Sequence, residues 1–75
     1  MGKRIQLIAE VTGNVWKVER SVGDELEEGD ALVIVESMKM EIPIEAPCAG
    51  RLVELRCAES DPIHEGQVVA VLEVR

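Results

Sequence analysis

Aromatic residues are nearly absent from this sequence: Phe and Tyr do not occur, and Trp16 is the single aromatic residue among 75. A core without large rings must be assembled from aliphatic side chains. Valine is the most frequent of these here, and its branched Cβ favours strands over helices. The composition therefore predicts a β protein, and we expect Trp16 to pack on the body of the domain rather than to anchor a partner.

Basic residues are also scarce, since 8 Lys and Arg against 15 Asp and Glu give a formal net charge of −7 at pH 7. Nucleic acids and anionic membrane surfaces both require a basic face, so this charge argues against either partner. The longest apolar runs hold about five residues, whereas about twenty are needed to span a bilayer. We expect a soluble protein whose acidity either maintains solubility or steers it toward basic partner surfaces.

Sulfur and imidazole ligands for a metal are few, because Cys48, Cys57 and His64 are the only cysteines and histidine. They form no CxxC pair and no tetrahedral ligand set. The sequence shows no signal-peptide pattern, so we expect a cytoplasmic protein whose reduced thiols serve as small apolar groups. Its length predicts a single domain over residues 1–75, too small for an enzyme cleft and a second domain.

Two strands meet at one short stretch of the chain. The apolar run 31–35 precedes Glu36-Ser37-Met38-Lys39-Met40-Glu41, and the alternating segment 42–46 follows it. Strands so close in sequence must form a hairpin, and a type I′ turn centred on Met38 and Lys39 would require positive φ at both. The pattern predicts an exposed tip that presents Lys39 as a site of covalent modification.

The chain also repeats itself at an offset of 37 residues, with halves at about 13–36 and 50–73. Glycines, turn acids and apolar positions keep register through both halves. The identities are Gly13 with Gly50, Asp24 with Asp61, Glu28 with Glu65, Gly29 with Gly66 and Glu36 with Glu73. Neither half can bury its apolar face alone. We therefore predict an all-β flattened barrel, or sandwich, of two four-stranded antiparallel sheets related by a pseudo-two-fold. The predicted tip has no counterpart in the second half, so it should lie opposite the chain termini.

Three motifs resemble those of a known family. They are Met38-Lys39-Met40 after the acidic Glu36, the segment Ala46-Pro47-Cys48-Ala49-Gly50, and the glycine turns at 23–24 and 28–29. From about residue 8 to 74 the chain resembles the biotinyl domains of biotin-dependent carboxylases, the biotin carboxyl carrier proteins, and their stand-alone biotin/lipoyl attachment relatives. The resemblance implies that a biotin protein ligase attaches biotin to Lys39. It also implies a non-catalytic carrier that moves a carboxyl group between biotin carboxylase and carboxyltransferase sites.

Alternatives to a biotin carrier remain at this point. Lipoyl domains share the fold but typically place Asp and Ala beside the lysine, so Met38 and Met40 favour biotin over a lipoyl carrier. A second alternative is a barrel that binds partners without being modified. Ser37 replaces the alanine most often found in the family, and the chain is too short for the "thumb" insertion of some bacterial carriers.

The residues that flank the lysine each allow two interpretations. Met38 and Met40 either contribute to recognition of the lysine or fold back on the barrel. Glu36 and Glu41 are either contacts for the ligase or solvated strand residues.

Overall fold

The computed structural model describes residues 2–75 and contains eight β-strands. They are β1 (Arg4–Ile8), β2 (Gly13–Val18), β3 (Glu25–Leu26), β4 (Ala31–Ser37), β5 (Met40–Glu45), β6 (Gly50–Leu55), β7 (Pro62–Ile63) and β8 (Val68–Val74). Within this described part of the chain, no helix has the length and apolarity that a membrane crossing requires.

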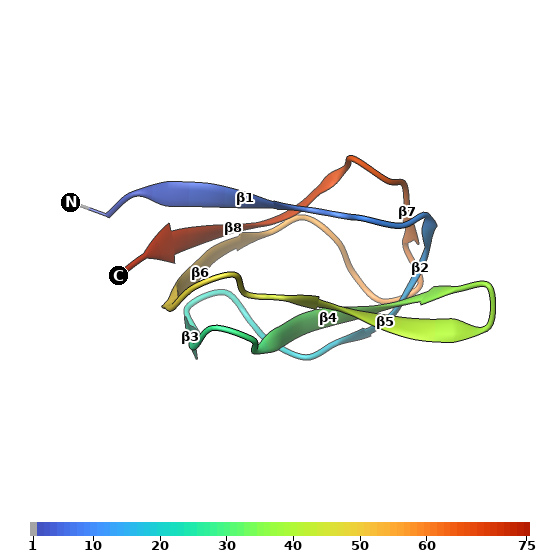
Figure 1. Ribbon diagram of the computed structural model, residues 1–75, viewed down its shortest axis with the longest axis horizontal. Helices are drawn as coiled ribbons and strands as arrows, with labels where there is room; N and C mark the ends of the chain where they lie inside the picture. The colour runs from blue at the N-terminus through green and yellow to red at the C-terminus, as the bar shows by residue number, and fades with distance from the viewer. Residues whose placement is uncertain (1) are drawn as a thin grey trace.

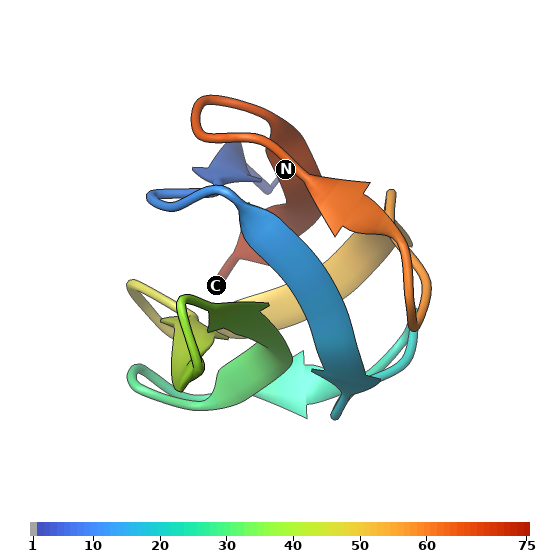
Figure 2. The same cartoon turned by 90° about the vertical axis from the view of Figure 1, so that its right-hand side faces the viewer.

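The strands form two four-stranded antiparallel sheets, with the orders β1-β8-β6-β3 and β5-β4-β2-β7. Figures 1 and 2 show the two sheets packed against each other. This confirms the predicted fold class. Strand β5 lies at a sheet edge and has a neighbouring strand on one side only. Pro43, which has no backbone N–H to donate, is tolerated at such an edge.

An internal two-fold relation at the 37-residue offset extends through the backbone. It matches β2, β3 and β4 with β6, β7 and β8, and their hydrogen bonds correspond. Gly29 N–H donates to Ala46 O, and Gly66 N–H donates to Ala9 O. Ala9 and Ala46 lie outside the segments 13–36 and 50–73, so the two-fold relation extends beyond the predicted halves. It makes β1 the equivalent of β5 in the other sheet. Ile5 and Ala9 are identical to the residues 37 positions later, a signal that the sequence contained.

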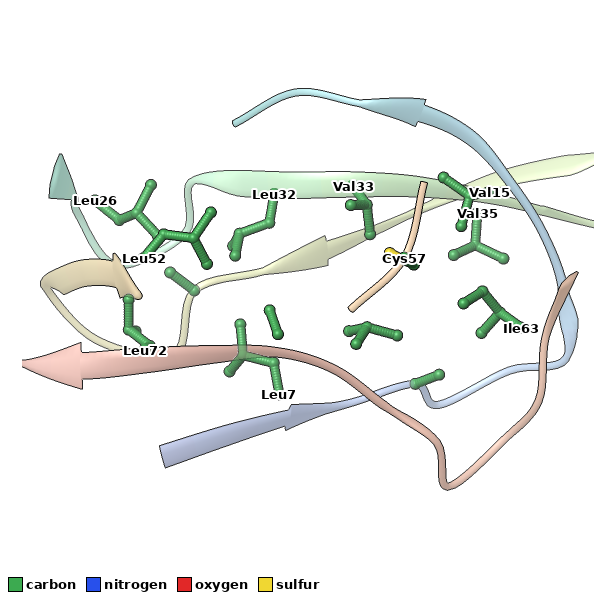
Figure 3. Close-up of a cluster of buried hydrophobic side chains, with 14 residues drawn as sticks. Leu7, Val15, Leu26, Leu32, Val33, Val35, Leu52, Cys57, Ile63 and Leu72 are labelled. Atoms are coloured by element: carbon green, nitrogen blue, oxygen red, sulfur yellow. The ribbon is translucent and has the colours of Figure 1, made fainter. Parts of the chain in front are cut away.

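Aliphatic side chains fill the space between the sheets (Figure 3). Leu26, Leu52 and Leu72 are fully buried, and each contributes about 1.5–3 kcal/mol by leaving water. Cys57 belongs to this core, and the half-buried Cys48 packs against the core from outside. Small branched side chains therefore build the core without aromatic rings.

Trp16 packs on the domain only in part, since 49% of its surface is exposed. The register between β2 and β4 shifts there: Val15 pairs with Val35, Lys17 pairs with Ile34, and Trp16 has no partner of its own. Such a β-bulge interrupts the alternation of inward and outward side chains. Alternation from the buried Val15 already points Trp16 outward, and the bulge then allows Val18, three positions after Val15, to pack against the core.

The molecule is elongated, with extents of 39 × 18 × 17 Å. In Figure 1 the β4–β5 turn lies at one end of the long axis, while β1 begins and β8 ends at the other. This agrees with the predicted opposition, with the start of β1 and the end of β8 both lying away from the hairpin tip.

Candidate functional site

The β4–β5 turn carries the candidate lysine. Ser37 pairs with Met40 as the last rung of the hairpin, which leaves Met38 and Lys39 as the two central residues. Their φ angles are 52° and 67°, as a type I′ turn requires. Each positive φ costs a residue with a Cβ about 1 kcal/mol or more. The pairing of β4 with β5 along their length holds the turn in this conformation.

The tip side chains extend into solvent. Met38 is 92% exposed and Met40 64% exposed, so neither folds back on the barrel. Lys39 is exposed as well, and it forms no ion pair with any other residue of the range 2–75. The lysine amine is therefore accessible to another protein's active site.

Two carboxylates lie one rung below the tip, where Glu36 on β4 pairs directly with Glu41 on β5. Both are exposed, and neither forms an ion pair within the described chain. The two-fold equivalent of Glu36 differs: Glu73 lies 4.0 Å from Arg4 and 3.1 Å from Arg51. Like charges placed directly opposite each other destabilise a strand pair slightly. Among residues 2–75, these two carboxylates thus have no ion-pair partner, unlike Glu73.

The tip end of β4 is held by Thr12 and Gly13, which the sequence did not identify as site residues. Ser37 Oγ donates a hydrogen bond of 2.7 Å to the backbone oxygen of Thr12. Gly13 lies so close to β4 that a Cβ there would be 2.2 Å from the backbone oxygen of Glu36. The identity of Gly13 with Gly50 in the repeat was the available signal for this close approach.

A surface hollow of about 330 Å³ lies elsewhere on the molecule. Its lining comprises Glu10, Glu28, Gly29, Pro43, Glu45, Ala46 and Pro47, and includes none of the tip residues 36–41. Lys39 therefore lies outside this hollow.

Comparison with known proteins gives consistent results. Residues 4–72 match the biotin/lipoyl family described as "Biotin-requiring enzyme". The "Biotin/lipoyl attachment protein" of Bacillus subtilis is 44% identical over 63 residues, which cover 84% of this chain and 86% of that protein. The "Biotinylated protein TB7.3 homolog" of Mycobacterium leprae is 42% identical over 64 residues, covering 85% of this chain and 90% of that one.

A solved structure is also similar, the urea carboxylase of Kluyveromyces lactis, with a TM-score of 0.89 and 33% identity. The match covers 96% of this chain but only 6% of that chain. The chain therefore corresponds to one small part of that carboxylase.

Proposed function

Because the chain belongs to the biotin/lipoyl attachment family of biotin-requiring enzymes, we propose that it is a biotin carrier with biotin attached to Lys39. The observation that carries this proposal is the position of the lysine, exposed between Met38 and Met40 on a type I′ turn at one end of the molecule. Its accessible amine, at the end of the molecule away from the start of β1 and the end of β8, fits covalent attachment.

Attachment requires a biotin protein ligase. Amide formation from a carboxylic acid needs an activated acyl donor and a base, and the exposed turn offers neither, so both must come from another protein. The amide forms when Lys39 Nζ attacks the carboxyl carbon of biotin and displaces the activating group attached there, and Nζ gives up two protons to the base and solvent. The turn is already ordered, so less conformational entropy is lost when the tip enters the ligase.

Once attached, biotin supplies a ureido nitrogen that accepts and releases a carboxyl group. Lys39 contributes reach, because the lysyl and biotinyl chains together extend on the order of 10–15 Å. Met38 and Met40 provide flexible apolar contacts that adapt to different partner surfaces. The partners are then the biotin carboxylase and the carboxyltransferase of a biotin-dependent carboxylase, and the domain itself catalyses neither reaction.

Glu36 and Glu41 are assigned to recognition of the ligase. Their negative charge is uncompensated, unlike that of the equivalent Glu73, and therefore suits a basic surface. We place the carrier in the cytoplasm, where Cys48 and Cys57 stay reduced.

The main alternative is a lipoyl carrier, which the family's inclusion of both kinds of attachment domain supports. The methionines beside Lys39 favour biotin. The double substitution Met38→Asp with Met40→Ala should lower the rate of biotinylation and allow lipoylation. Equal biotinylation of the double variant and the wild type would show that the methionines do not discriminate.

The decisive experiment is intact mass spectrometry after co-expression with a biotin protein ligase and biotin. The wild type should gain one biotinyl group, and Lys39→Arg should gain none while remaining folded. Lys17→Arg is the matched control, because Lys17 is an exposed strand lysine away from the turn, and it should be labelled fully. Absence of labelling on the wild type, in a mixture where a known carrier is labelled, would refute the proposal.

A further inference from the structure

Beyond the rung at Glu36, one side-chain hydrogen bond ties the hairpin tip to the body of the domain among residues 2–75. Asn14 pairs with Glu36 in the last rung that joins β4 to β2, and β4 beyond that rung pairs with β5 alone. The hydrogen bond from Ser37 Oγ to Thr12 O is the one side-chain hydrogen bond that joins residues 37–40 to the rest of the described chain. The direction in which the tip projects therefore depends on Ser37.

The two-fold relation shows what this hydroxyl replaces. The equivalent of Thr12 is Ala49, whose backbone oxygen accepts a hydrogen bond of 3.2 Å from Arg75 N–H. Arg75 is in turn the equivalent of Met38, which enters the turn with a φ of 52°. In the tip half, the donor to this carbonyl is the side chain of Ser37, whose own equivalent is the apolar Val74. The Ser37 hydroxyl thus replaces the backbone N–H donor that the turn at Met38 has moved away from this carbonyl.

Thr12 is itself fixed by a second hydroxyl contact. Its Oγ1 accepts a hydrogen bond of 3.1 Å from Glu65 N–H in the β7–β8 loop. The equivalent Ala49 has no hydroxyl, so this contact also occurs only in the tip half. Ser37, Thr12 and Glu65 form a continuous connection from the hairpin to the β7–β8 loop, which joins the two sheets.

We infer that Ser37 is a positioning residue for Lys39, whose hydroxyl, held through Thr12, fixes the hairpin in the direction in which the ligase receives the lysine. The inference rests on the proposed function. Loss of the hydroxyl leaves the lysine amine unaltered, so the chemical step is unaffected. Without the hydroxyl the tip is less ordered, so more conformational entropy is lost when the tip binds the ligase.

The test is steady-state biotinylation of the unmodified domain by a biotin protein ligase with ATP and biotin, at varied domain concentration. Ser37→Ala should raise KM about 3- to 10-fold, the worth of one exposed hydrogen bond, with kcat within about two-fold of wild type. Ser37→Thr retains a hydroxyl and should restore KM. Ser21→Ala, an exposed serine in the β2–β3 loop, should change neither constant.

A second measurement separates positioning from general stability. Amide hydrogen exchange at Met38 and Lys39 should be faster in Ser37→Ala than in wild type, while exchange in β6 and β8 stays the same. Thr12→Val keeps the carbonyl acceptor but removes the Glu65 contact. It should raise KM less than Ser37→Ala, and the double variant should be non-additive.

An unchanged KM in Ser37→Ala, or a fall in kcat alone, would overturn the inference while leaving the proposed function intact. A wild type that accepts no biotin refutes the proposed function. The exchange experiment then decides alone whether Ser37 orders the tip.

Discussion

The close approach at Gly13 gives a prediction that links stability to presentation of the lysine. In Gly13→Ala the new Cβ would lie 2.2 Å from the backbone oxygen of Glu36, well below the 3.0 Å that real Cβ contacts respect. The obstacle is backbone, so β2 or β4 must shift by roughly 0.8 Å, and overpacking of this kind costs about 1–3 kcal/mol. For a domain of this size each kcal/mol lowers Tm by about 4–8 °C.

The two-fold relation supplies the matched control. In Gly50→Ala the new Cβ would lie 2.4 Å from the backbone oxygen of Glu73, so the loss of stability should be similar. The functional effects should differ, because Glu36 is three residues before Lys39 and Glu73 lies near the terminal end. Gly13→Ala should slow biotinylation at a temperature where both variants are folded, and Gly50→Ala should not.

Urea unfolding measures the first effect and ligase kinetics the second. If Gly13→Ala lowers the free energy of unfolding by less than about 0.5 kcal/mol, then β2 and β4 shift apart at almost no energetic cost. Equal slowing of biotinylation in both folded variants would show that the shift at Glu36 is not transmitted to the tip.

Two further predictions concern the thiols and the positive-φ turns. Burial raises the pKa of the Cys57 thiol, with a smaller contribution from Asp61, so Cys57 should react with a thiol reagent at pH 8 more slowly than Cys48. As pH rises, the Cys57 thiol ionises in the unfolded chain before it ionises in the folded protein, so the free energy of unfolding should fall above the ordinary thiol pKa. Equal reactivity of Cys57 and Cys48 would contradict the burial of Cys57. Gly23→Ala places a Cβ at a φ of 101° without any contact within 4 Å, so urea unfolding should show a loss of about 1 kcal/mol. Ser60→Gly, at the equivalent turn with a φ of 76°, should change stability by under about 0.5 kcal/mol, and a larger loss there than in Gly23→Ala would contradict this reasoning.

Features with local or periodic sequence signals were predictable. The apolar runs that flank Lys39 predicted the hairpin, and the 37-residue repeat predicted two matched sheets. Positive φ at Met38 and Lys39 followed from the two-residue loop, because only the primed turns match the twist of paired strands. Each of these depends on spacing along the chain.

Features that depend on tertiary contacts were not predictable from spacing. The bulge at Trp16 is a register shift against β4, and nothing in the sequence of β2 alone specifies it. The bond from Ser37 to Thr12 joins residues 25 positions apart, so Ser37 was noted only as a departure from alanine. The pairing of Glu36 with Glu41 followed from the hairpin. Which carboxylates have a nearby cation, as Glu73 does, is visible only once the folded surface is known.

The terminal end of the molecule is, in effect, a second hairpin without its turn. Val74 N–H donates a hydrogen bond of 2.7 Å to Lys3 O, across strands that end together. At the 37-residue offset, the two residues that would complete that turn are Arg75 and Gly2. A peptide bond between them, with Met1 removed, would close a circular backbone through an Arg-Gly turn, whose glycine readily adopts positive φ. The circle would have lower unfolded-state entropy and no ends to fray, and it could be reopened at another loop while Lys39 kept its place.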